Sequence, residues 1–421
     1  MYPLYINRYM LKRIIICSLL YIFFFLSEVN ALSLDEVIKK ALLNYPGYKI
    51  KKYDVELGKI NLKLSYSNFY PQLSSNVSGN ENYDDLKGTN GSITADLNYN
   101  LFSGFSDIID VIINRLNLHL TNFVYDDYRR YIKMNVSNIY FDILKTSEIL
   151  KSYKNIVESS KVALDIARSR YQIGRIRQVE YLQAEVDFNR SKYEYESNLQ
   201  ALRNLFINLS TFTGEVYDTT TELDTYFEEI KVYDIGFYIK KGTHNNINVV
   251  TSQYNAKIAS KEIKKAHSEF YPKIDIFAQK GRFYNEYNAP EYYTGSQVGA
   301  RATFDLFTGF RRYYNVIGNK TEYYQSLMKE KEALNNMEEQ IRTLYNNIIS
   351  YNAQFIYLSS LLEHTKTNYQ LTLESFALGK SNILELLDTR DRYEQSFMDY
   401  YNARYKIVND YNELKYISGI D

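Results

Sequence analysis

The 421-residue chain contains one cysteine, no tryptophan and five prolines. The cysteine, Cys17, lies near the N-terminus, so no disulfide or thiolate metal site can form in the rest of the chain. Basic and acidic residues balance at 50 each, which argues against the basic surface of a nucleic-acid-binding protein. The few prolines and a mean hydropathy of -0.40 exclude a proline-rich disordered chain and a protein with many membrane-spanning helices.

The N-terminus has the pattern of a secretory signal peptide. Basic residues precede an uncharged apolar run from Ile14 to Leu26, and Val29-Asn30-Ala31 is typical of a cleavage site. The sequence predicts that residues 1–31 direct export and are removed, with either Met1 or Met10 as the start. A membrane anchor is the alternative, but the run is shorter than the roughly 20 apolar residues that span a bilayer.

Two motifs occur twice at nearly the same spacing. Phe69-Tyr70-Pro71 recurs 201 residues later as Phe270-Tyr271-Pro272, and Leu101-Phe102-Ser103-Gly104-Phe105 recurs 205 residues later as Leu306-Phe307-Thr308-Gly309-Phe310. The second offset also carries Gly174 onto Gly379 and Gly214 onto Gly419. We therefore expect two tandem copies of one unit.

Each copy has a region in which apolar and polar residues alternate. The alternation runs from Ile93 to Leu101 in the first copy and from Val298 to Leu306 in the second. A period of two is typical of a strand with one apolar face. Together with the apolar stretches after Pro71 and Pro272, the pattern predicts one strand pair per copy.

A much longer helical pattern follows each strand pair. From Gly104 to Gly174 it covers some seventy residues, or roughly 100 Å, far more than an ordinary globular helix. Seam residues, defined by a 3-4-3-4 spacing, run from Val136 to Tyr171 and again from Ile341 to Phe376. Such a seam requires partner helices in a left-handed coiled coil. The glycines then predict helix ends and shorter return helices.

These patterns give a predicted organisation. After the signal peptide (1–31), a first repeat (32–214) comprises a helix, a strand pair (69–102), a long helix (105–173) and a return helix (178–213). A linker (215–235) leads to the second repeat (236–421), which comprises a helix, a strand pair (270–307), a long helix (310–378) and a return helix (382–418).

The repeated motifs, with Arg170-Tyr171-x-x-Gly174 and Leu182-Gln183-Ala184-Glu185, closely resemble the outer membrane efflux protein family. That family forms the exit ducts of tripartite drug pumps and type I secretion systems, and the resemblance covers Leu32 to Gly419. It implies a mainly α fold with a β-barrel segment, in which three protomers each contribute four strands to one twelve-stranded outer-membrane barrel. Long coiled-coil helical hairpins would form a tunnel across the periplasm.

The residues themselves also require assembly, because four strands cannot close a barrel and open sheet edges are not tolerated in lipid. In a barrel, the face from Ile93 to Leu101 would meet lipid. The polar positions Asp96, Asn98, Arg301 and Asp305 would line the water-filled lumen.

No catalytic, metal or cofactor site is predicted, and an enzyme is not expected. His119, His244, His267 and His364 are scattered and form no HExxH motif. Gly379-Lys380-Ser381 resembles the end of a phosphate-binding loop, but position 374 is Glu where Gly is required.

The turn after Gly379 is the most interesting region. Glu385 and Asp388 lie one helical turn apart, and Glu180 has the place of Glu385 in the first repeat, whereas Gln183 replaces the second acid. The resemblance implies that these acids ring a narrow periplasmic entrance. It also implies adaptor contacts at Ile173, Gly174, Arg175, Arg177, Leu378, Gly379 and Lys380. For the acids, the alternative is an exposed pair that the helix dipole favours. Arg175 and Arg177 could hold the entrance closed through salt links, and the alternative is that both are simply solvated.

The sequence therefore predicts a passive, homotrimeric export duct that works with a periplasmic adaptor and an inner-membrane transporter, with no nucleic acid. Energy would come from the transporter. The alternative is a secreted or surface coiled-coil stalk with a structural or adhesive role, which would need no lipid-facing strands. Cargo is left open, because drug ducts and protein-secretion ducts share these features.

Overall fold

The computed structural model describes residues 31–82, 88–225, 230–285 and 291–420. The predicted signal peptide, with Cys17 and both candidate starts, lies outside the described residues. Two compact units are present: unit 1 extends to Tyr45 and includes Ile132–Lys231 and Ile348–Asn409, and unit 2 comprises Pro46–Tyr131, Val232–Asn347 and the chain from Asp410. Each unit therefore combines segments of both sequence repeats.

Each repeat begins with two helices where the periodicity suggested one. Helix α2 (Leu34–Asn44) starts at a capping box between Ser33 and Glu36. It stops at Tyr45, whose backbone is extended, because Pro46 disfavours a helical residue before it and begins α3 (Pro46–Ser67). In the second repeat, Asn246 ends α6 (Ile235–Asn245) and caps α7 (Ile247–Ser268) by accepting from the backbone of Asn248 and Val249.

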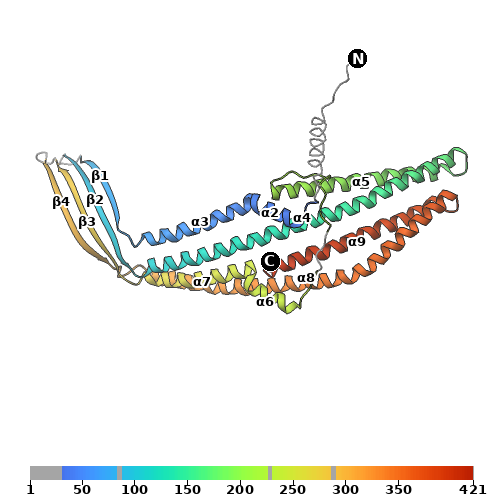
Figure 1. The fold of residues 1–421 in the computed structure, drawn as a ribbon. Helices are drawn as coiled ribbons and strands as arrows, with labels where there is room; N and C mark the ends of the chain where they lie inside the picture. Colours follow the sequence, from blue (N-terminus) through green and yellow to red (C-terminus); the bar gives the residue numbers. More distant parts are fainter. Residues whose placement is uncertain (1–30, 83–87, 226–229, 286–290, 421) are drawn as a thin grey trace, which may run out of the picture. The chain divides into compact units, whose positions relative to one another are not determined.

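Two helical hairpins carry the seam residues: α4 (Ser106–Gln172) with α5 (Gln178–Thr213), and α8 (Arg311–Leu378) with α9 (Ile383–Ile417) (Figure 1). In unit 1 a core cluster joins all four helices, including Ile156, Ala184, Tyr369 and Phe397. Every seam residue is buried or half-buried except Tyr171, whose ring stacks on Tyr181. Among the described residues, no helix is apolar over a length that would cross a membrane.

Asparagines fix the ends of the return helices. In unit 1, the Asn44 side chain donates to the Thr213 carbonyl at the end of α5 (2.6 Å). In unit 2, Asn246 donates to the Ile417 carbonyl at the end of α9 (2.9 Å). The linker adds a bridge in unit 1 between Leu32 and Leu223. Both repeats therefore use an asparagine at the helix break to hold the end of the return helix, although Asn44 ends α2 and Asn246 follows the end of α6.

The four strands form one antiparallel sheet in the order β1-β2-β3-β4. They are β1 (Gln72–Asn82), β2 (Gly88–Ser103), β3 (Lys273–Asn285) and β4 (Glu291–Thr303). The central pairing joins the two repeats, because Leu97 of β2 lies opposite Ala278 of β3. Within the described chain, β1 and β4 are the sheet edges.

The large apolar side chains gather on one face of the sheet, which also carries Lys280 and Arg282 of β3, and the other face is mainly polar. Large apolar side chains that are exposed in the single chain occupy the apolar face: Leu73, Val77, Ile93, Leu97, Ile276 and Val298. On the polar face, Asp96 accepts hydrogen bonds from Asn76 and Gln279. The alternating pattern of the sequence continues to Leu306, but β4 stops at Thr303. In β2, a bulge at Leu101 interrupts the pairing with β3.

The Gly-Phe pair of the repeated motif turns the chain from the sheet into each long helix. Gly104 and Phe105 both have positive φ, 68° and 72°, and so do Gly309 and Phe310, 61° and 65°. Left-handed backbone is costly for phenylalanine, but the Phe105 ring packs edge-on against Phe102 at 5.0 Å. A side chain at position 104 would also collide with the Ser268 carbonyl, whereas Gly309 has open space around it and only its positive φ favours glycine.

Candidate functional site

Both hairpins of unit 1 end in the same turn. We call residues 173–177 and 378–382 the tip turns. Gly174 and Gly379 have φ of 71° and 78°, and the following backbone N–H groups of Arg175 and Lys380 donate five residues back, to Arg170 and Ser375. This arrangement is the Schellman helix end that glycine favours.

Arg170 joins the last turn of α4 to the last turn of α8, next to the tip turns. Its guanidinium donates to the carbonyls of Phe376 (2.8 Å) and Ala377 (3.0 Å), in the last turn of α8, and lies 5.2 Å from the Phe376 ring. A cation at a helix C-terminus satisfies carbonyls that lack helical partners and interacts favourably with the helix dipole. Ile173 and Leu378 remain exposed on the turns.

The predicted entrance acids are exposed or half-buried, and each has a local partner. Glu385 accepts from the Ser381 hydroxyl at 2.7 Å. Asp388 pairs with Arg392 at 2.9 Å, and Glu180 pairs with Arg177 at 2.8 Å. Glu385 and Asp388 lie on the exposed side of α9, opposite the buried Ile383 and Leu386. The Arg177 salt link therefore forms inside one hairpin, and the role of these acids stays a prediction.

Of the four predicted lumen residues, three lie on the polar face of the sheet in unit 2. Asp96 and Asn98 occupy alternate positions of β2, and Arg301 of β4 lies over the Phe277 ring at 5.2 Å. Asp305 lies beyond the end of β4 and pairs with Arg312 at 3.2 Å.

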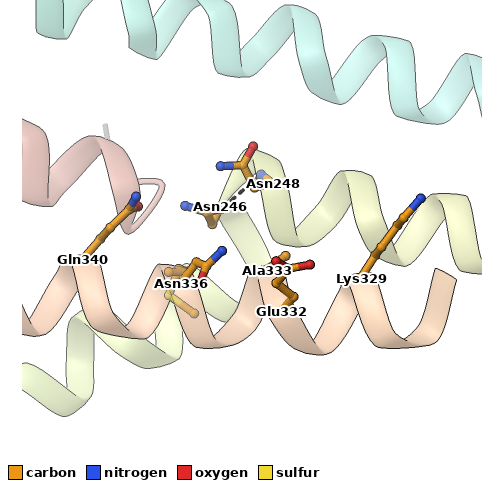
Figure 2. Close-up of a pocket in the computed structure, with 8 residues that line it drawn as sticks. Asn246, Asn248, Lys329, Glu332, Ala333, Asn336 and Gln340 are labelled. Carbon is orange, nitrogen blue, oxygen red and sulfur yellow. Dashed lines mark hydrogen bonds between the residues drawn. The ribbon is translucent and has the colours of Figure 1, made fainter. Parts of the chain in front are cut away.

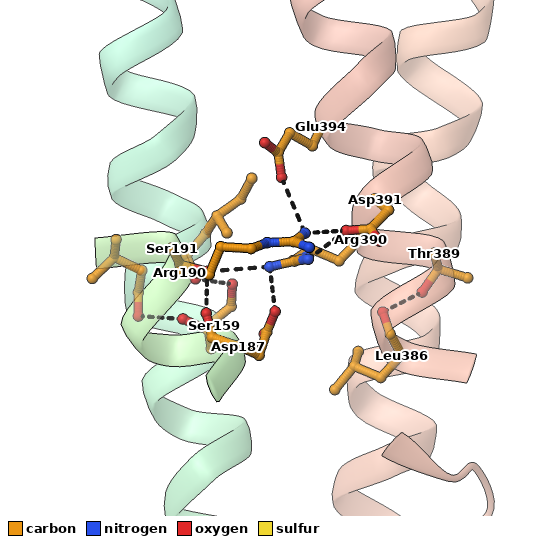
Figure 3. Close-up of polar contacts among 12 residues, drawn as sticks. Ser159, Asp187, Arg190, Ser191, Leu386, Thr389, Arg390, Asp391 and Glu394 are labelled. Carbon is orange, nitrogen blue, oxygen red and sulfur yellow. Dashed lines mark hydrogen bonds and ion pairs between the residues drawn. The ribbon is translucent and has the colours of Figure 1, made fainter. Parts of the chain in front are cut away.

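The sequence reasoning missed a charged cluster inside unit 1, between α5 and α9 (Figure 3). Arg390 is 2% exposed, and its guanidinium forms ion pairs with Asp187 and Asp391 and donates to Ser191 at 3.3 Å. Arg190 of α5 pairs with Asp391 and, at 3.8 Å, with Glu394. We call Asp187, Arg190, Arg390, Asp391 and Glu394 the Arg390 cluster.

The Arg390 cluster contains two cations and three carboxyl groups, so it is neutral when it holds one proton. Asp187 is its most buried carboxyl group. Burial raises the pKa of Asp187 to about 7, while the positive charge of Arg190 opposes the rise and the negative charges of Asp391 and Glu394 add to it. Because the groups interact, the proton belongs to the cluster as a whole.

A signal for this cluster was present in the sequence. Ile383, Leu386, Arg390, Tyr393 and Phe397 have the 3-4-3-4 spacing of a seam, and so do Ala184, Asp187 and Ser191. Arg390 and Asp187 are therefore charged residues at seam positions. A polar residue at such a position specifies register and partner more than it adds stability.

A polar cleft of about 220 Å³ in unit 2 offers no catalytic arrangement (Figure 2). Its lining includes Asn248, Lys329, Glu332 and Asn336, while Asn246 is engaged with backbone groups. Across the part of the chain that the structure describes, no group of three or more His, Cys, Asp or Glu could hold a metal ion.

The chain is similar to known outer-membrane proteins. Residues 239–419 match the family described as outer membrane efflux protein. The outer membrane protein TolC of Salmonella enteritidis is 18% identical over 405 residues, which cover 93% of this chain and 82% of TolC.

Two solved structures are similar in fold. A membrane protein from Pseudomonas aeruginosa has a TM-score of 0.78 and 13% identity, with 92% of this chain and 90% of that chain covered. The CmeC outer membrane channel of Campylobacter jejuni has a TM-score of 0.77 and 16% identity, with 92% and 85% covered.

The match to the family lies in the second repeat, and the similarity in fold extends over both repeats and includes the helices and the sheet. The mainly helical fold with a four-stranded segment, expected from the sequence, is confirmed. The second repeat therefore matches the outer membrane efflux protein family, and the whole chain shares its fold with solved structures that include an outer membrane channel.

Proposed function

We propose that three copies of this chain form a passive duct, with a twelve-stranded barrel in the outer membrane and a helical tunnel in the periplasm. The observation that carries the proposal is the single sheet with one apolar face and two edges. An isolated sheet of this kind would expose its apolar face to water and its edge backbone groups to lipid. Closure by further copies pairs the edges, and insertion into the outer membrane covers the apolar face with lipid.

In the proposed duct, the two repeats, residues 32–214 and 236–421, form the two halves of each protomer, and the linker joins them. Asp96, Asn98 and Arg301 would line the lumen. The tip turns would contact a periplasmic adaptor, for which the exposed Ile173 and Leu378 supply apolar anchors. An inner-membrane transporter would supply the energy. The duct could serve drug efflux or type I secretion.

At the periplasmic entrance, we propose that Glu385 and Asp388 from each copy surround the axis. Their exposure on one side of α9 supports this arrangement. Asp388 carries a cationic partner in Arg392, whereas Glu385 has a neutral one in Ser381, so Glu385 would contribute most of the negative potential.

The test is fractionation of cells that express the full chain, followed by sizing in mild detergent with light scattering. A trimer in the outer-membrane fraction, with gel mobility that changes on heating, supports the duct. A stable monomer would overturn it. A soluble, secreted oligomer would instead support the coiled-coil stalk.

A further inference from the structure

Two cations lie on the apolar face of the sheet. Lys280 and Arg282 occupy successive positions of β3 on that face, opposite Ala95 and Ile93 of β2, and both are exposed. Two residues along a strand span about 7 Å, so the two charges are neighbours. On the described part of this face the one acid is Glu81 of β1, and β2 separates it from β3.

On the other side of β3, the cations have hydroxyl neighbours. Lys280 lies opposite Ser296 of β4, and Arg282 lies opposite Thr294. Residues that are directly opposite have Cβ atoms about 4.5–5.5 Å apart. We call Lys280, Arg282, Thr294 and Ser296 the β3–β4 patch. Two cations and two hydroxyl groups within one such area can donate several hydrogen bonds to a single anion.

The position of the patch along the strand matters, because a cation that faces lipid is most costly at the bilayer midplane. Strand β3 begins at Lys273, next to the helices, and Arg282 is nine positions further along. At about 3.3 Å per residue and a tilt of about 35–45°, that is roughly 21–25 Å of height. The apolar band of an outer-membrane barrel is about 25 Å tall. In the proposed duct, Arg282 would therefore lie near the outer border of this band.

Aromatic residues mark the same level. Tyr284 and Tyr292 lie opposite each other on the apolar face, just beyond the patch, with ring centroids 4.8 Å apart. The Arg282 guanidinium lies 5.2 Å from the Tyr292 ring. Tyrosines gather at membrane interfaces, where one end of the ring is apolar and the other is wet. Their place beyond the patch agrees with an interfacial level.

The first strand pair has no such patch. The 201-residue offset carries Lys280 onto Gly79 and Arg282 onto Glu81. The corresponding positions of β1 therefore carry no cation. The two cations are a feature of the second strand pair and not a requirement of the sheet.

We propose that the β3–β4 patch binds the phosphate of a lipid headgroup in the outer leaflet of the outer membrane, with a phosphate monoester preferred. This inference rests on the proposed duct, in which the far end of the sheet faces outward. A phosphate monoester has three terminal oxygens and nearly two negative charges, which match two cations with adjacent hydroxyl groups. The exposed Val298, on the helix side of the patch, would contact the acyl chains. These apolar neighbours favour a lipid over free phosphate.

The test uses the full chain, purified as a trimer in mild detergent. The probe is lipid A with two phosphate monoesters, counted by native mass spectrometry and titrated to obtain Kd. We expect one lipid A per copy, and at least tenfold weaker binding to Lys280→Gln with Arg282→Gln. Lys280→Arg with Arg282→Lys keeps both charges and should bind within threefold of the parent. Arg301→Gln, which removes a cation from the polar face, should leave Kd unchanged.

Three comparisons decide the ligand. Phosphatidylcholine or phosphatidylglycerol binding as tightly as lipid A would overturn the preference for a monoester. Displacement of lipid A by millimolar inorganic phosphate would overturn the lipid source. Unchanged binding by the double glutamine variant, in an intact trimer, would overturn the site and leave the duct standing. A monomer of the unmodified chain would overturn the duct itself.

Discussion

Arg390 of α9 and Asp187 of α5 form a buried ion pair at seam positions of the two hairpins. Every other large side chain at the neighbouring seam positions of α9 is apolar or aromatic. Burying two charges costs nearly as much as their attraction returns, so the pair defines which helical levels meet more than it stabilises them.

Removal of one partner should therefore be far more costly than removal of both. We expect Arg390→Met to destabilise unit 1 by about 3–5 kcal/mol, because Asp187 would lose its buried cation. The double variant Arg390→Met with Asp187→Leu should recover most of that loss. Thermal unfolding followed by circular dichroism measures the difference. The exposed Arg392→Met, which breaks a surface pair with Asp388, should cost about 0.2–1 kcal/mol. Equal losses for the single and double variants would contradict the cluster's role.

The stability contribution of Asp187 should depend on pH. Its pKa in the folded protein is about 7, above the usual value of 3.8. Such a carboxyl group stabilises the fold fully below about pH 3.8, and this contribution is lost as the pH rises through about 7. The melting temperature of Asp187→Asn, relative to the parent, should therefore be higher at about pH 8 than at about pH 5. Asp165→Asn, an exposed change on α4, should show no such trend. A relative melting temperature that falls with pH would contradict the prediction.

Arg170 should control the order of the tip turns. Arg170→Gln removes two charge-assisted hydrogen bonds to the end of α8, worth about 1.5–3 kcal/mol each at most. We expect faster protease cleavage at residues 378–382, with the barrel region unaffected. Arg168→Gln, an exposed change on the same helix, serves as the control. Unchanged cleavage in the Arg170 variant would show that the turn is held by its glycine backbone alone.

The two faces of β2 should respond oppositely to a charge. Leu97→Arg places a cation on the apolar face and should cost about 2–4 kcal/mol if that position lies near the bilayer midplane. Asn98→Arg, on the polar face, should be tolerated. The yield of assembled trimer from outer membranes measures both. Equal losses would show that the assignment of the faces is wrong.

Neutralising the entrance acids should weaken cation selectivity. In the proposed trimer, the acids of three copies would come together around the axis and attract cations, so Glu385→Gln with Asp388→Asn should reduce selectivity and block by trivalent ions in planar bilayers. The trimer should stay intact. Glu158→Gln with Asp165→Asn removes two exposed acids elsewhere on α4 and should leave both properties unchanged, because screening acts within about 8 Å at physiological salt. Unchanged selectivity in the entrance variant would leave Glu385 and Asp388 as an ordinary exposed pair.

The repeated motifs and the seam residues predicted the fold class well. The period of the apolar residues and the spacing between motifs can be read from residue types alone. The helix breaks at Tyr45 and Asn246 were missed although Pro46 and the capping pattern of Asn246 mark them. A long amphipathic pattern continues through such a break, since both helices keep one face inward. The early end of β4 had no local signal, because the alternation continues to Leu306.

Arg390 was missed for a different reason. Charged residues on long helices are usually solvated, and only the position within the seam distinguishes this arginine. Its partners Asp187 and Ser191 lie about 200 residues away on α5, so their proximity depends on how the hairpins pack. The proposed roles of Glu385 and Asp388 would depend on neighbouring copies, which a single chain does not contain.

The central pairing of the sheet sets an order for biogenesis. The hydrogen bond between Asp96 and Gln279 joins residues 183 positions apart. During export, β1 and β2 therefore emerge long before β3 and β4, and their apolar face and open edge meet water in the meantime. Contacts of such long sequence separation form slowly, and the waiting segment is prone to aggregate. The first strand pair must therefore avoid aggregation until the second pair is available to cover its edge.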